Sequence, residues 1–543
     1  MHGLHQVRAR DPSDPIIPKG SVALKGGVRA WAYALALFVL AFPLFNPDVF
    51  WHLAAGRWIW AHHAVPRADS FSFTREGAPW IDFEWLTQAL WFVVQSVAGL
   101  WGLWALKVVL MAAAFFPIDG LLRDKGATPL ARAAAAALWS GAALGVADVR
   151  PDLASLIFFG VLLRRLEAGR ASFRFGFVLF ALWCNLHAGF VFGFALYALY
   201  AAVSMRRGRD TTAVASEAAG AALGCLLNPY GWGLFSVYFA HASGPSVKRY
   251  VMEWAPPTWR HSFQIPLVAL LFAALAALAV RLSRRRRMPA ELTAATALFG
   301  AAAAFSARFG GFFASSVAAL AFCVFPDPPA VAVALGLAVL TPMIPVFQNR
   351  WTYPFHSNYV ARRAVTFVAC QKATLGGLRL FNQYEWGGDM DWRLGPGWRV
   401  FDDGRYLFAG LLAQTQGALE SPRSLDEFAS RWRLDGFLIA DYPSKAETVR
   451  IESDGTRREI PRPWHILFFP RQRWALVYWD DQALLYVDRA KVPADWLAAH
   501  EYRWRHPGDD AALSDALAHD EVPRAALAAE DARHAAELAA GVY

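Results

Sequence analysis

Long apolar runs separated by short polar loops occupy the chain from Trp31 to Phe347 and then stop. A transmembrane helix needs roughly 17–25 predominantly apolar residues. By this criterion we identify about eleven candidate spans, several of them short: 30–46, 99–121, 129–147, 152–167, 172–184, 188–205, 212–227, 264–282, 289–305, 310–325 and 329–346. The sequence therefore predicts a polytopic α-helical membrane protein followed by a soluble C-terminal part.

The composition and length favour the same organisation. Hydrophobic residues make up 56% of the 543 residues and charged residues only 18%, whereas a typical soluble domain is about 25% charged. We expect an N-terminal tail at 1–29, a multi-pass domain at 30–346 with a large first outer loop at 47–98, an α/β domain at 347–507 and a helical tail at 508–543.

The distribution of Lys and Arg predicts the orientation of the chain. When the N-terminus is placed in the cytoplasm, most of the Lys and Arg of the short loops fall on the cytoplasmic side, as the positive-inside rule requires. An odd number of spans then places the C-terminal domain outside. We expect a bacterial inner (cytoplasmic) membrane protein with a periplasmic C-terminal domain. The net charge of +9 belongs to this pattern, so we expect no nucleic-acid partner.

The stretch "NPDVFWHLAAGRWIW" directly follows the first apolar run and contains Asp48 and His52. Residues spaced i and i+4 lie on one face of a helix. One interpretation is a surface helix that Asp48 caps, with a solvated His52. The other is an active site at the membrane surface.

Further polar residues fall at the outward-facing ends of the predicted spans. They are Asp69, Asp82, Glu84, Arg150, Asp152, Asn185, His187, Asn228 and Arg308, and Lys107 lies inside the second predicted span. Ionisable residues at bilayer depth are costly and are often functional. We therefore expect these residues to bind substrate or a donor phosphate at one face of the membrane.

Several of these residues also have a simpler structural interpretation. Asp69 can stabilise the turn after Pro66, and Asp82 and Glu84 can cap the amphipathic stretch that follows them. A lysine or arginine near a span end can extend its charged group to the interface, and a histidine can be hydrogen-bonded within the core.

A carboxylate and basic groups at the membrane surface favour glycosyl transfer from a lipid-linked sugar. The leaving phosphate needs a positive group to stabilise its developing charge, and the acceptor hydroxyl needs a carboxylate base within hydrogen-bond reach. The loops contain neither a P-loop nor a strand–GxGxxG–helix unit, so nucleotide binding of those kinds is not indicated.

Two segments of the first outer loop carry a family resemblance. "NPDVFWHLAAG" places Asp48 directly after the first span, and "EWLTQALWFVVQSV" is similar to a juxtamembrane helix. The chain resembles the GT-C superfamily of multi-pass glycosyltransferases, which use polyprenyl-linked sugar donors. The blocks "RPDLAS", "NLHAGFVFG" and "NPYGW" are similar to a bacterial branch of such proteins. The resemblance covers about 30–346.

By this resemblance Asp48 is the base that activates the acceptor or is a metal ligand. The family often has adjacent acids, whereas Val49 and Phe50 follow Asp48 here. His52 could supply the second polar group, or Asp82 and Glu84 could. A divalent metal, Mg²⁺ or Mn²⁺, is therefore an open alternative as cofactor.

The segment after Gln348 predicts a small α/β domain over 365–490, because short aromatic strands alternate with turns. Asp402, Asp403 and Arg405 in "VFDDGR" could bind sugar, seat the domain on the membrane part, or form an internal ion pair. The Ala-rich tail from about 508 has helical periodicity and predicts a helical hairpin that contacts another element or an envelope-biosynthesis protein.

These observations predict a glycosyltransferase. It would transfer a hexosyl or pentosyl group from a polyprenyl-phosphate or polyprenyl-diphosphate donor to an envelope acceptor during polysaccharide biosynthesis. Two alternatives from other classes are a transporter or flippase and a non-catalytic assembly protein for lipid-linked envelope glycans. A transporter should place polar residues at mid-bilayer in broken helices, and the sequence places them at the outer span ends.

Overall fold

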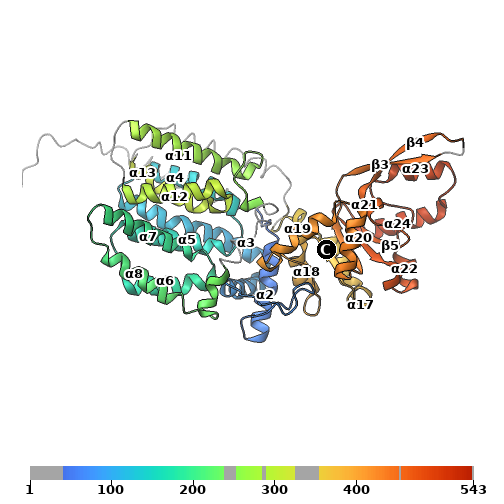
Figure 1. The fold of residues 1–543 in the computed structure, drawn as a ribbon, viewed down its shortest axis with the longest axis horizontal. Helices are drawn as coiled ribbons and strands as arrows, with labels where there is room; N and C mark the ends of the chain where they lie inside the picture. The colour runs from blue at the N-terminus through green and yellow to red at the C-terminus, as the bar shows by residue number, and fades with distance from the viewer. Residues whose placement is uncertain are drawn as a thin grey trace, which may run out of the picture.

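The computed structural model describes residues 41–237, 252–283, 289–324, 352, 354–451 and 454–540. The predicted N-terminal tail, most of the span at 30–46 and the span at 329–346 lie outside these residues. In the described part, a helical bundle lies at one end of an elongated molecule and a mixed α/β domain at the other. The helices α2 and α18 lie between them (Figure 1).

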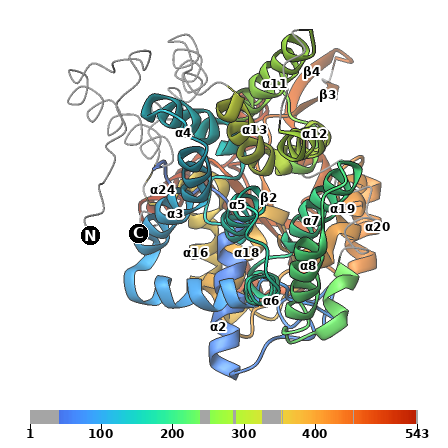
Figure 2. The ribbon, with the colours of Figure 1, turned by 90° about the vertical axis from the view of Figure 1, so that its left-hand side faces the viewer.

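Ten α-helices of the described residues belong to the N-terminal part. They are α2 (Asp48–His62), α3 (Trp85–Asp124), α4 (Pro129–Ala143), α5 (Asp152–Glu167), α6 (Phe173–Leu186), α7 (Phe190–Arg206), α8 (Thr212–Gly224), α11 (Ile265–Ser283), α12 (Ala290–Phe305) and α13 (Gly310–Val324). Figure 2 shows many of the bundle helices from their ends, gathered around α5. Helices from α4 onward match the predicted apolar runs within a few residues, whereas α3 begins at Trp85, well before the predicted run at 99–121.

Within the described residues, α3 alone is both long and apolar enough to cross a membrane. Five shorter apolar helices, in the regions of α6, α7, α11, α12 and α13, accompany it. The helical architecture is therefore confirmed, and the number of spans stays a prediction. The described end of the first predicted span, 41–46, is not helical: Leu44 forms a β-bridge with Phe355.

A break at Gly99 divides α3 into two parts. Gly99 has φ 61° and ψ −160°, a conformation that essentially only glycine adopts. The part before it corresponds to the expected juxtamembrane helix, and the part after it to the second predicted span. The sharp change of direction keeps the start of α3 within the first outer loop.

Close helix packing brings α6 against α8. A Cβ atom at Gly176, Gly220 or Gly224 would lie within 3.0 Å of a backbone oxygen of the facing helix. Small residues allow helix backbones to approach in this way, which is typical of membrane helices. Elsewhere in the core, Phe159 packs edge-to-face against Phe299 at a centroid distance of 4.8 Å.

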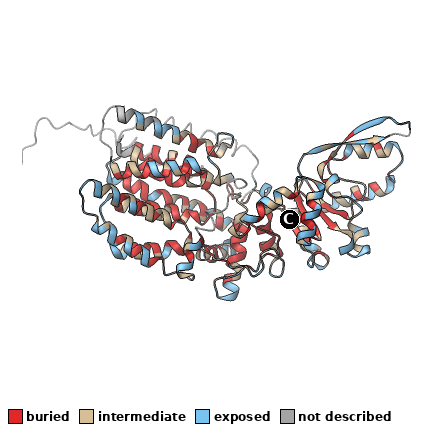
Figure 3. Ribbon diagram, viewed as in Figure 1, coloured by how far each residue is buried: buried red, intermediate tan, exposed pale blue. Residues whose placement is uncertain are grey.

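The C-terminal part is a small α/β domain, as predicted. Its strands are β1 (Leu380–Asn382), β2 (Gly436–Ala440), β3 (Lys445–Ile451), β4 (Arg457–Pro463), β5 (Trp474–Trp479) and β6 (Ala483–Asp488). The main sheet has the order β1-β2-β6-β5, with β1 parallel to β2 and the other neighbours antiparallel. β3 and β4 form a separate hairpin. Figure 3 shows buried residues inside the bundle and along the main sheet.

Helices surround the sheet on both sides. They are α16 (Arg362–Cys370), α17 (Lys372–Leu375), α18 (Gly387–Leu394), α19 (Ala409–Ala418), α20 (Pro422–Trp432), α21 (Trp464–Phe468), α22 (Ala494–His500), α23 (Asp510–Ala518) and α24 (Arg524–Ala540). The tail helices pack on their own domain: Glu530 accepts the N–H of Arg505 at 2.8 Å, and His534 stacks on Trp479 at 3.6 Å. The expected contact of the tail with another element is therefore internal.

The first outer loop pairs directly with the C-terminal domain. The Phe73 N–H donates to the Val400 carbonyl at 3.0 Å, and the Val400 N–H donates to the Phe71 carbonyl at 3.0 Å. Arg57 on α2 donates to the Asp391 carbonyl at 2.8 Å and to the Trp392 carbonyl at 2.9 Å. Main-chain and side-chain hydrogen bonds therefore hold the two parts of the molecule together.

Candidate functional site

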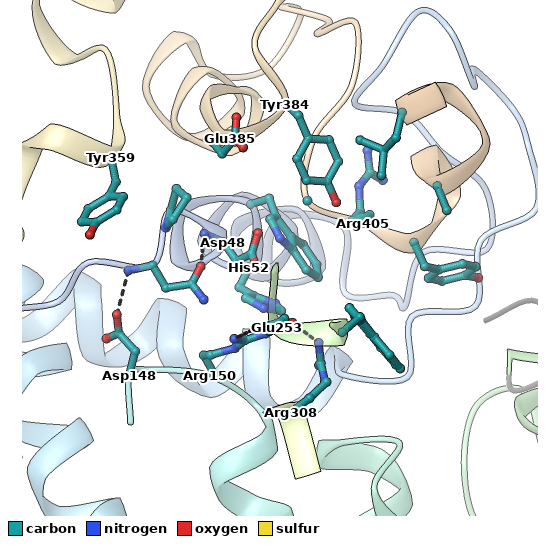
Figure 4. Close-up of a pocket in the computed structure, with 18 of the residues that line it drawn as sticks. Asp48, His52, Asp148, Arg150, Glu253, Arg308, Tyr359, Tyr384, Glu385 and Arg405 are labelled. Carbon is teal, nitrogen blue, oxygen red and sulfur yellow. Dashed lines mark hydrogen bonds and ion pairs between the residues drawn. The ribbon is translucent and has the colours of Figure 1, made fainter. Parts of the chain in front are cut away.

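A cavity of about 460 Å³ lies where the helical bundle meets the C-terminal domain. The bundle contributes the start of α2, the loop before α5, the segment around Glu253, and Arg308. The C-terminal domain contributes residues 383–385 and several residues between 402 and 419. Figure 4 shows Asp48 between the two sets of walls, with Arg150 and Arg308 on one side and Tyr384 on the other.

Asp48 is the first residue of α2 and lines the cavity. The carboxylate of Asp148 fixes the approaching chain, because it accepts the N–H groups of Phe45 at 2.8 Å and Asn46 at 2.7 Å. The side chain of Asn46 in turn accepts the N–H of Asp48 at 2.9 Å. α2 is not the solvated surface helix of the first interpretation, because His52 is only 3% exposed.

The surroundings of Asp48 shift its ionisation. Burial raises the pKa of Asp48 to about 6, and the positive charge of Arg150 opposes this rise. A carboxyl with a pKa near 6 is mostly ionised at neutral pH, and it is a stronger base than an exposed aspartate. These are the properties that a general base needs.

Glu84 lies between His52 on α2 and His187, the residue that follows α6. Its carboxylate oxygens are 3.9 Å from His52 Nδ1 and 3.7 Å from His187 Nε2, which is longer than a hydrogen bond. Burial raises the pKa of Glu84 well above its usual range, and the charge of Asp82 adds to the rise. Burial lowers the pKa of His52, and Arg150 lowers it further. His52 is therefore neutral, and the centre of its ring lies 3.6 Å from that of Trp51, with the two rings tilted against each other.

Asp82 also lines the cavity, next to Glu84 in the sequence. Its Oδ1 accepts Gln88 Nε2 at 2.7 Å, and its N–H donates to the Tyr230 hydroxyl at 3.0 Å. Burial raises the pKa of Asp82 to about 7. The cap interpretation is wrong for α3, which begins at Trp85 without a side-chain cap; the Asp82 carboxylate instead accepts the Glu84 N–H at 3.3 Å in the turn before the helix.

Arg150 and Arg308 share one carboxylate. Arg150 Nη2 donates to Glu253 Oε1 at 2.8 Å, and Nη1 of each arginine donates to Glu253 as well. Burial would raise the pKa of Glu253, but the two guanidinium groups outweigh burial and lower it to about 2. Asp152 Oδ2 lies 3.9 Å from Arg150 Nε. The cavity wall thus presents two guanidinium groups beside Asp48, and one carboxylate bridges them.

The structure brings six of the twelve predicted site residues into the cavity wall in addition to Asp48: His52, Asp82, Glu84, Arg150, Asp152 and Arg308. His187 is adjacent, lining a small apolar slot that also contacts Asp152 and Arg308. Its Nδ1 lies 2.8 Å from the Ser155 hydroxyl. The structure therefore brings most of the candidate residues together in one region, and their functional roles stay a prediction.

Four predicted site residues line neither the cavity nor the slot: Asp69, Lys107, Asn185 and Asn228. Each is engaged in a structural interaction, as polar groups in a protein interior usually are. Lys107 donates to the Phe42 carbonyl, and Asn185 accepts Trp85 Nε1 at 2.8 Å. Asn228 accepts the Tyr230 N–H within a turn at 2.8 Å. Asp69 pairs with Arg405 Nη1 at 2.7 Å, joining the first outer loop to the C-terminal domain.

Sequence reasoning missed Glu253, Tyr384 and Glu385, all of which line the cavity. Glu253 had a detectable signal: it is an acid in an outer loop that otherwise carries Lys and Arg. Tyr384 and Glu385 had none, because only the docking of the C-terminal domain brings them opposite Asp48.

Among the described residues, the cavity side chains do not form a ready-made set of ligands for a divalent metal. In the part of the chain that the structure describes, no group of three or more His, Cys, Asp or Glu side chains is arranged to hold a metal ion. The nearest acids to Arg150 and Arg308 are instead engaged with these guanidinium groups. The alternative in which Asp48 is a metal ligand therefore gains no support from this geometry.

No family model and no curated protein matches this chain. Solved structures do match. The oligosaccharyltransferase of Archaeoglobus fulgidus in its apo form is 12% identical, with a TM-score of 0.51 over 90% of this chain and 82% of that chain. The Archaeoglobus fulgidus oligosaccharyltransferase AglB, in complex with an inhibitory peptide and a dolichol-phosphate, is 11% identical, with a TM-score of 0.54 over 91% and 83%.

ArnT from Cupriavidus metallidurans bound to undecaprenyl phosphate also matches, at 13% identity and a TM-score of 0.44 over 87% of this chain and 98% of that chain. The two oligosaccharyltransferase structures extend the likeness through both the bundle and the C-terminal domain. The GT-C-like fold expected from the sequence is therefore confirmed.

Proposed function

We propose that this GT-C-like protein is a membrane glycosyltransferase that uses a polyprenyl-phosphate or polyprenyl-diphosphate sugar donor. The observation that carries the proposal is that the carboxylate of Asp48 and the guanidinium groups of Arg150 and Arg308 line one cavity. The shared fold adds support, because an archaeal oligosaccharyltransferase of that fold has been solved with a dolichol-phosphate.

In this reaction Asp48 is the base. The acceptor hydroxyl gives its proton to the Asp48 carboxylate while its oxygen forms a bond to the anomeric carbon of the donor sugar. The bond between that carbon and the phosphate oxygen breaks, and its electron pair leaves with the phosphate. Base and leaving group act on opposite faces of the sugar in such a single displacement, by analogy with inverting hydrolysis.

Arg150 and Arg308 would bind the phosphate and stabilise its developing negative charge. Guanidinium groups suit this role, because their planar donors match phosphate oxygens in pairs. Directly behind Arg308 the slot is lined by apolar side chains from the bundle: Val146, Leu156, Phe192, Phe309 and Phe312. In this proposal the phosphate of the donor lies at the arginines and its lipid lies toward the bundle.

We also propose a location, an orientation and a transferred group for the protein. The protein would lie in a bacterial inner membrane with its N-terminus in the cytoplasm and the cavity and C-terminal domain facing the periplasm. It would transfer a hexosyl or pentosyl group to an envelope acceptor. An envelope-biosynthesis protein could bind through the C-terminal domain.

The test is donor consumption by the full chain in lipid nanodiscs. Polyprenyl-phosphate and polyprenyl-diphosphate sugars, together with a membrane extract as acceptor source, are followed by mass spectrometry. Wild type should release the lipid phosphate, and Asp48→Asn should lower the rate by about 10²–10⁴-fold, the contribution of a general base. The matched control is Asp520→Asn, an exposed aspartate in the tail, where asparagine tolerates the positive φ of 55°.

An unchanged rate in Asp48→Asn would contradict the proposal. Movement of a lipid-linked sugar across a vesicle membrane without a new glycosidic bond would favour the transporter or flippase. No turnover and no transport, with the cellular glycan still dependent on the protein, would favour the assembly protein.

A further inference from the structure

A short segment of the C-terminal domain, residues 402–405, lies against the first turn of α2. A Cβ atom built on Gly404 would lie well within 3.0 Å of Asp48 Oδ1 and 2.7 Å from Trp51 Nε1. Gly404 is not among the glycines with positive φ, so its conformation does not require glycine. Glycine is required at this position because a Cβ atom would collide with the side chain of Asp48.

We infer that Gly404 seats the Asp48 carboxylate and that segment 402–405 is a positioning element of the catalytic site. This inference rests on the proposed function, in which Asp48 is the base. It assigns a role to the C-terminal domain that composition and spacing do not reveal. The bundle would supply the base and the guanidinium groups, and the C-terminal domain would fix where the base points.

An ion-pair clamp holds the segment in place. Arg405 Nη2 lies 2.6 Å from Asp403 Oδ2, and Arg405 Nη1 lies 2.7 Å from Asp69 Oδ1. Arg405 is 2% exposed, and its guanidinium carbon lies 4.6 Å from the ring centre of Trp80. Asp69 and Trp80 belong to the first outer loop, so the clamp joins the two parts of the molecule one residue away from Gly404.

Asp69 is itself held in a defined orientation. Its Oδ2 accepts the Ser72 hydroxyl at 2.5 Å, and its Oδ1 accepts the Phe71 N–H at 3.1 Å. A carboxylate fixed by its own turn offers Arg405 a rigid partner. Asp69 therefore both stabilises its own turn and binds Arg405, which joins the C-terminal domain to the first outer loop.

A second close approach confirms that this junction is tight. A Cβ atom on Gly388, in the first turn of α18, would lie 2.9 Å from the backbone nitrogen of Trp51. A Cβ atom on Gly387 would lie well within 3.0 Å of the Asp402 carbonyl oxygen. Gly388 and Gly404 thus let the domain reach the backbone and side chains at the start of α2, and Gly387 lets α18 pack closely on the segment 402–405.

The atom that a Cβ at position 404 meets first is the end of a side chain and not backbone. Gly404→Ala can therefore fold with the Asp48 carboxylate rotated out of its seat. A misplacement of about 1 Å in a catalytic group can lower a rate by about 10²-fold. The inference thus predicts a variant that keeps its fold and loses its activity.

The experiment compares the full-length variants Gly404→Ala and Gly377→Ala. Gly377 is exposed, and a Cβ there would meet nothing within 4 Å. Gly404→Ala should lower kcat about 100-fold with a melting temperature close to that of wild type, and Gly377→Ala should match wild type in both.

The second readout is carbodiimide labelling of Asp48 as a function of pH, followed by peptide mass spectrometry, because carbodiimide reacts with the protonated carboxyl. Gly404→Ala should move the labelling midpoint down toward the range of an exposed aspartate, since the carboxyl leaves its buried seat. Should Gly404→Ala fold poorly, Arg405→Lys replaces it. That variant keeps the charge, loses the paired geometry and should show the same two changes.

Wild-type activity and an unchanged labelling midpoint in Gly404→Ala would overturn the inference, even where Asp48→Asn is inactive and the proposed function stands. Full activity of Asp48→Asn would overturn the proposed function. The labelling midpoint would then still report whether Gly404 seats the carboxyl. A loss of activity in Gly404→Ala with an unchanged midpoint would also count against the inference, because the carboxyl would have kept its place.

Discussion

Asp48 combines a raised pKa with a position beside two guanidinium groups. Burial raises its pKa to about 6, and Arg150 limits that rise. Because the folded-state pKa lies above the ordinary value, protonated Asp48 favours the fold, and this stability is lost as pH rises through about 6. The ionised form is the one that can act as a base. Stability and activity therefore respond to pH in opposite directions at this residue.

The rate should rise with pH and level off above a midpoint near 6, because the base must be ionised to accept the proton of the acceptor. The measurement is kcat between pH 4.5 and 8 with saturating donor. A rate that is flat or falls over this range would show that the ionised form of Asp48 is not needed.

The Glu253 carboxylate binds Arg150 and Arg308, the two arginines that would bind the donor phosphate. Glu253→Gln should lower the KM for donor several-fold, because phosphate no longer competes with a carboxylate for Arg150 and Arg308. Glu253 also raises the pKa of Asp48, so the pH midpoint should fall. Steady-state kinetics with varied donor measure both effects.

The control for this substitution is Glu427→Gln, whose side chain is 67% exposed. A higher donor KM in Glu253→Gln would contradict the prediction. It would indicate that the carboxylate orders the two arginines for phosphate binding.

At the scale of elements, the break in α3 determines where the acids of the first outer loop lie. Asp82 and Glu84 immediately precede α3, and Gln88 in its first turn binds the Asp82 carboxylate. The conformation of Gly99 (φ 61°, ψ −160°) allows the juxtamembrane part to leave the direction of the following span.

Gly99→Ala should destabilise the protein by about 1–3 kcal/mol, the cost of a non-glycine residue in such a backbone conformation. A Cβ there would meet no atom within 4 Å, so strain and not crowding is the cause. Thermal unfolding of the purified variant in detergent measures the effect, and Gly377→Ala is the control. Equal melting temperatures for the two variants would show that α3 straightens without cost.

Apolar runs and turn residues were sufficient to predict most elements. The ranges of α5, α7 and α12 follow directly from runs bounded by Arg, Pro and Gly. The pairing of elements was not predictable in this way. Asp69 and Arg405 each had a local interpretation, and nothing near either residue indicates that they bind each other. The partner of Lys107 was not predictable either, because its ammonium group donates a hydrogen bond to the backbone carbonyl of Phe42.

At the scale of the whole molecule, the cavity belongs to both parts of the chain. The bundle supplies a carboxylate and two guanidinium groups, and the C-terminal domain supplies Tyr384, Glu385 and Gly404. The bundle residues of the cavity were predictable because the topology predicted from the sequence places the ends of their spans on one membrane face. The contribution of the C-terminal domain depends on docking, which contacts distant in sequence determine.

The central claim is that Asp48 makes this protein a transferase of lipid-linked sugar. The most direct measurement is the glycan and lipid profile, by mass spectrometry, of a deletion strain rescued with wild type, Asp48→Asn or Asp520→Asn. The account predicts that wild type and Asp520→Asn restore one specific sugar, while Asp48→Asn is inserted at the same level and does not. Full rescue by Asp48→Asn would contradict the account.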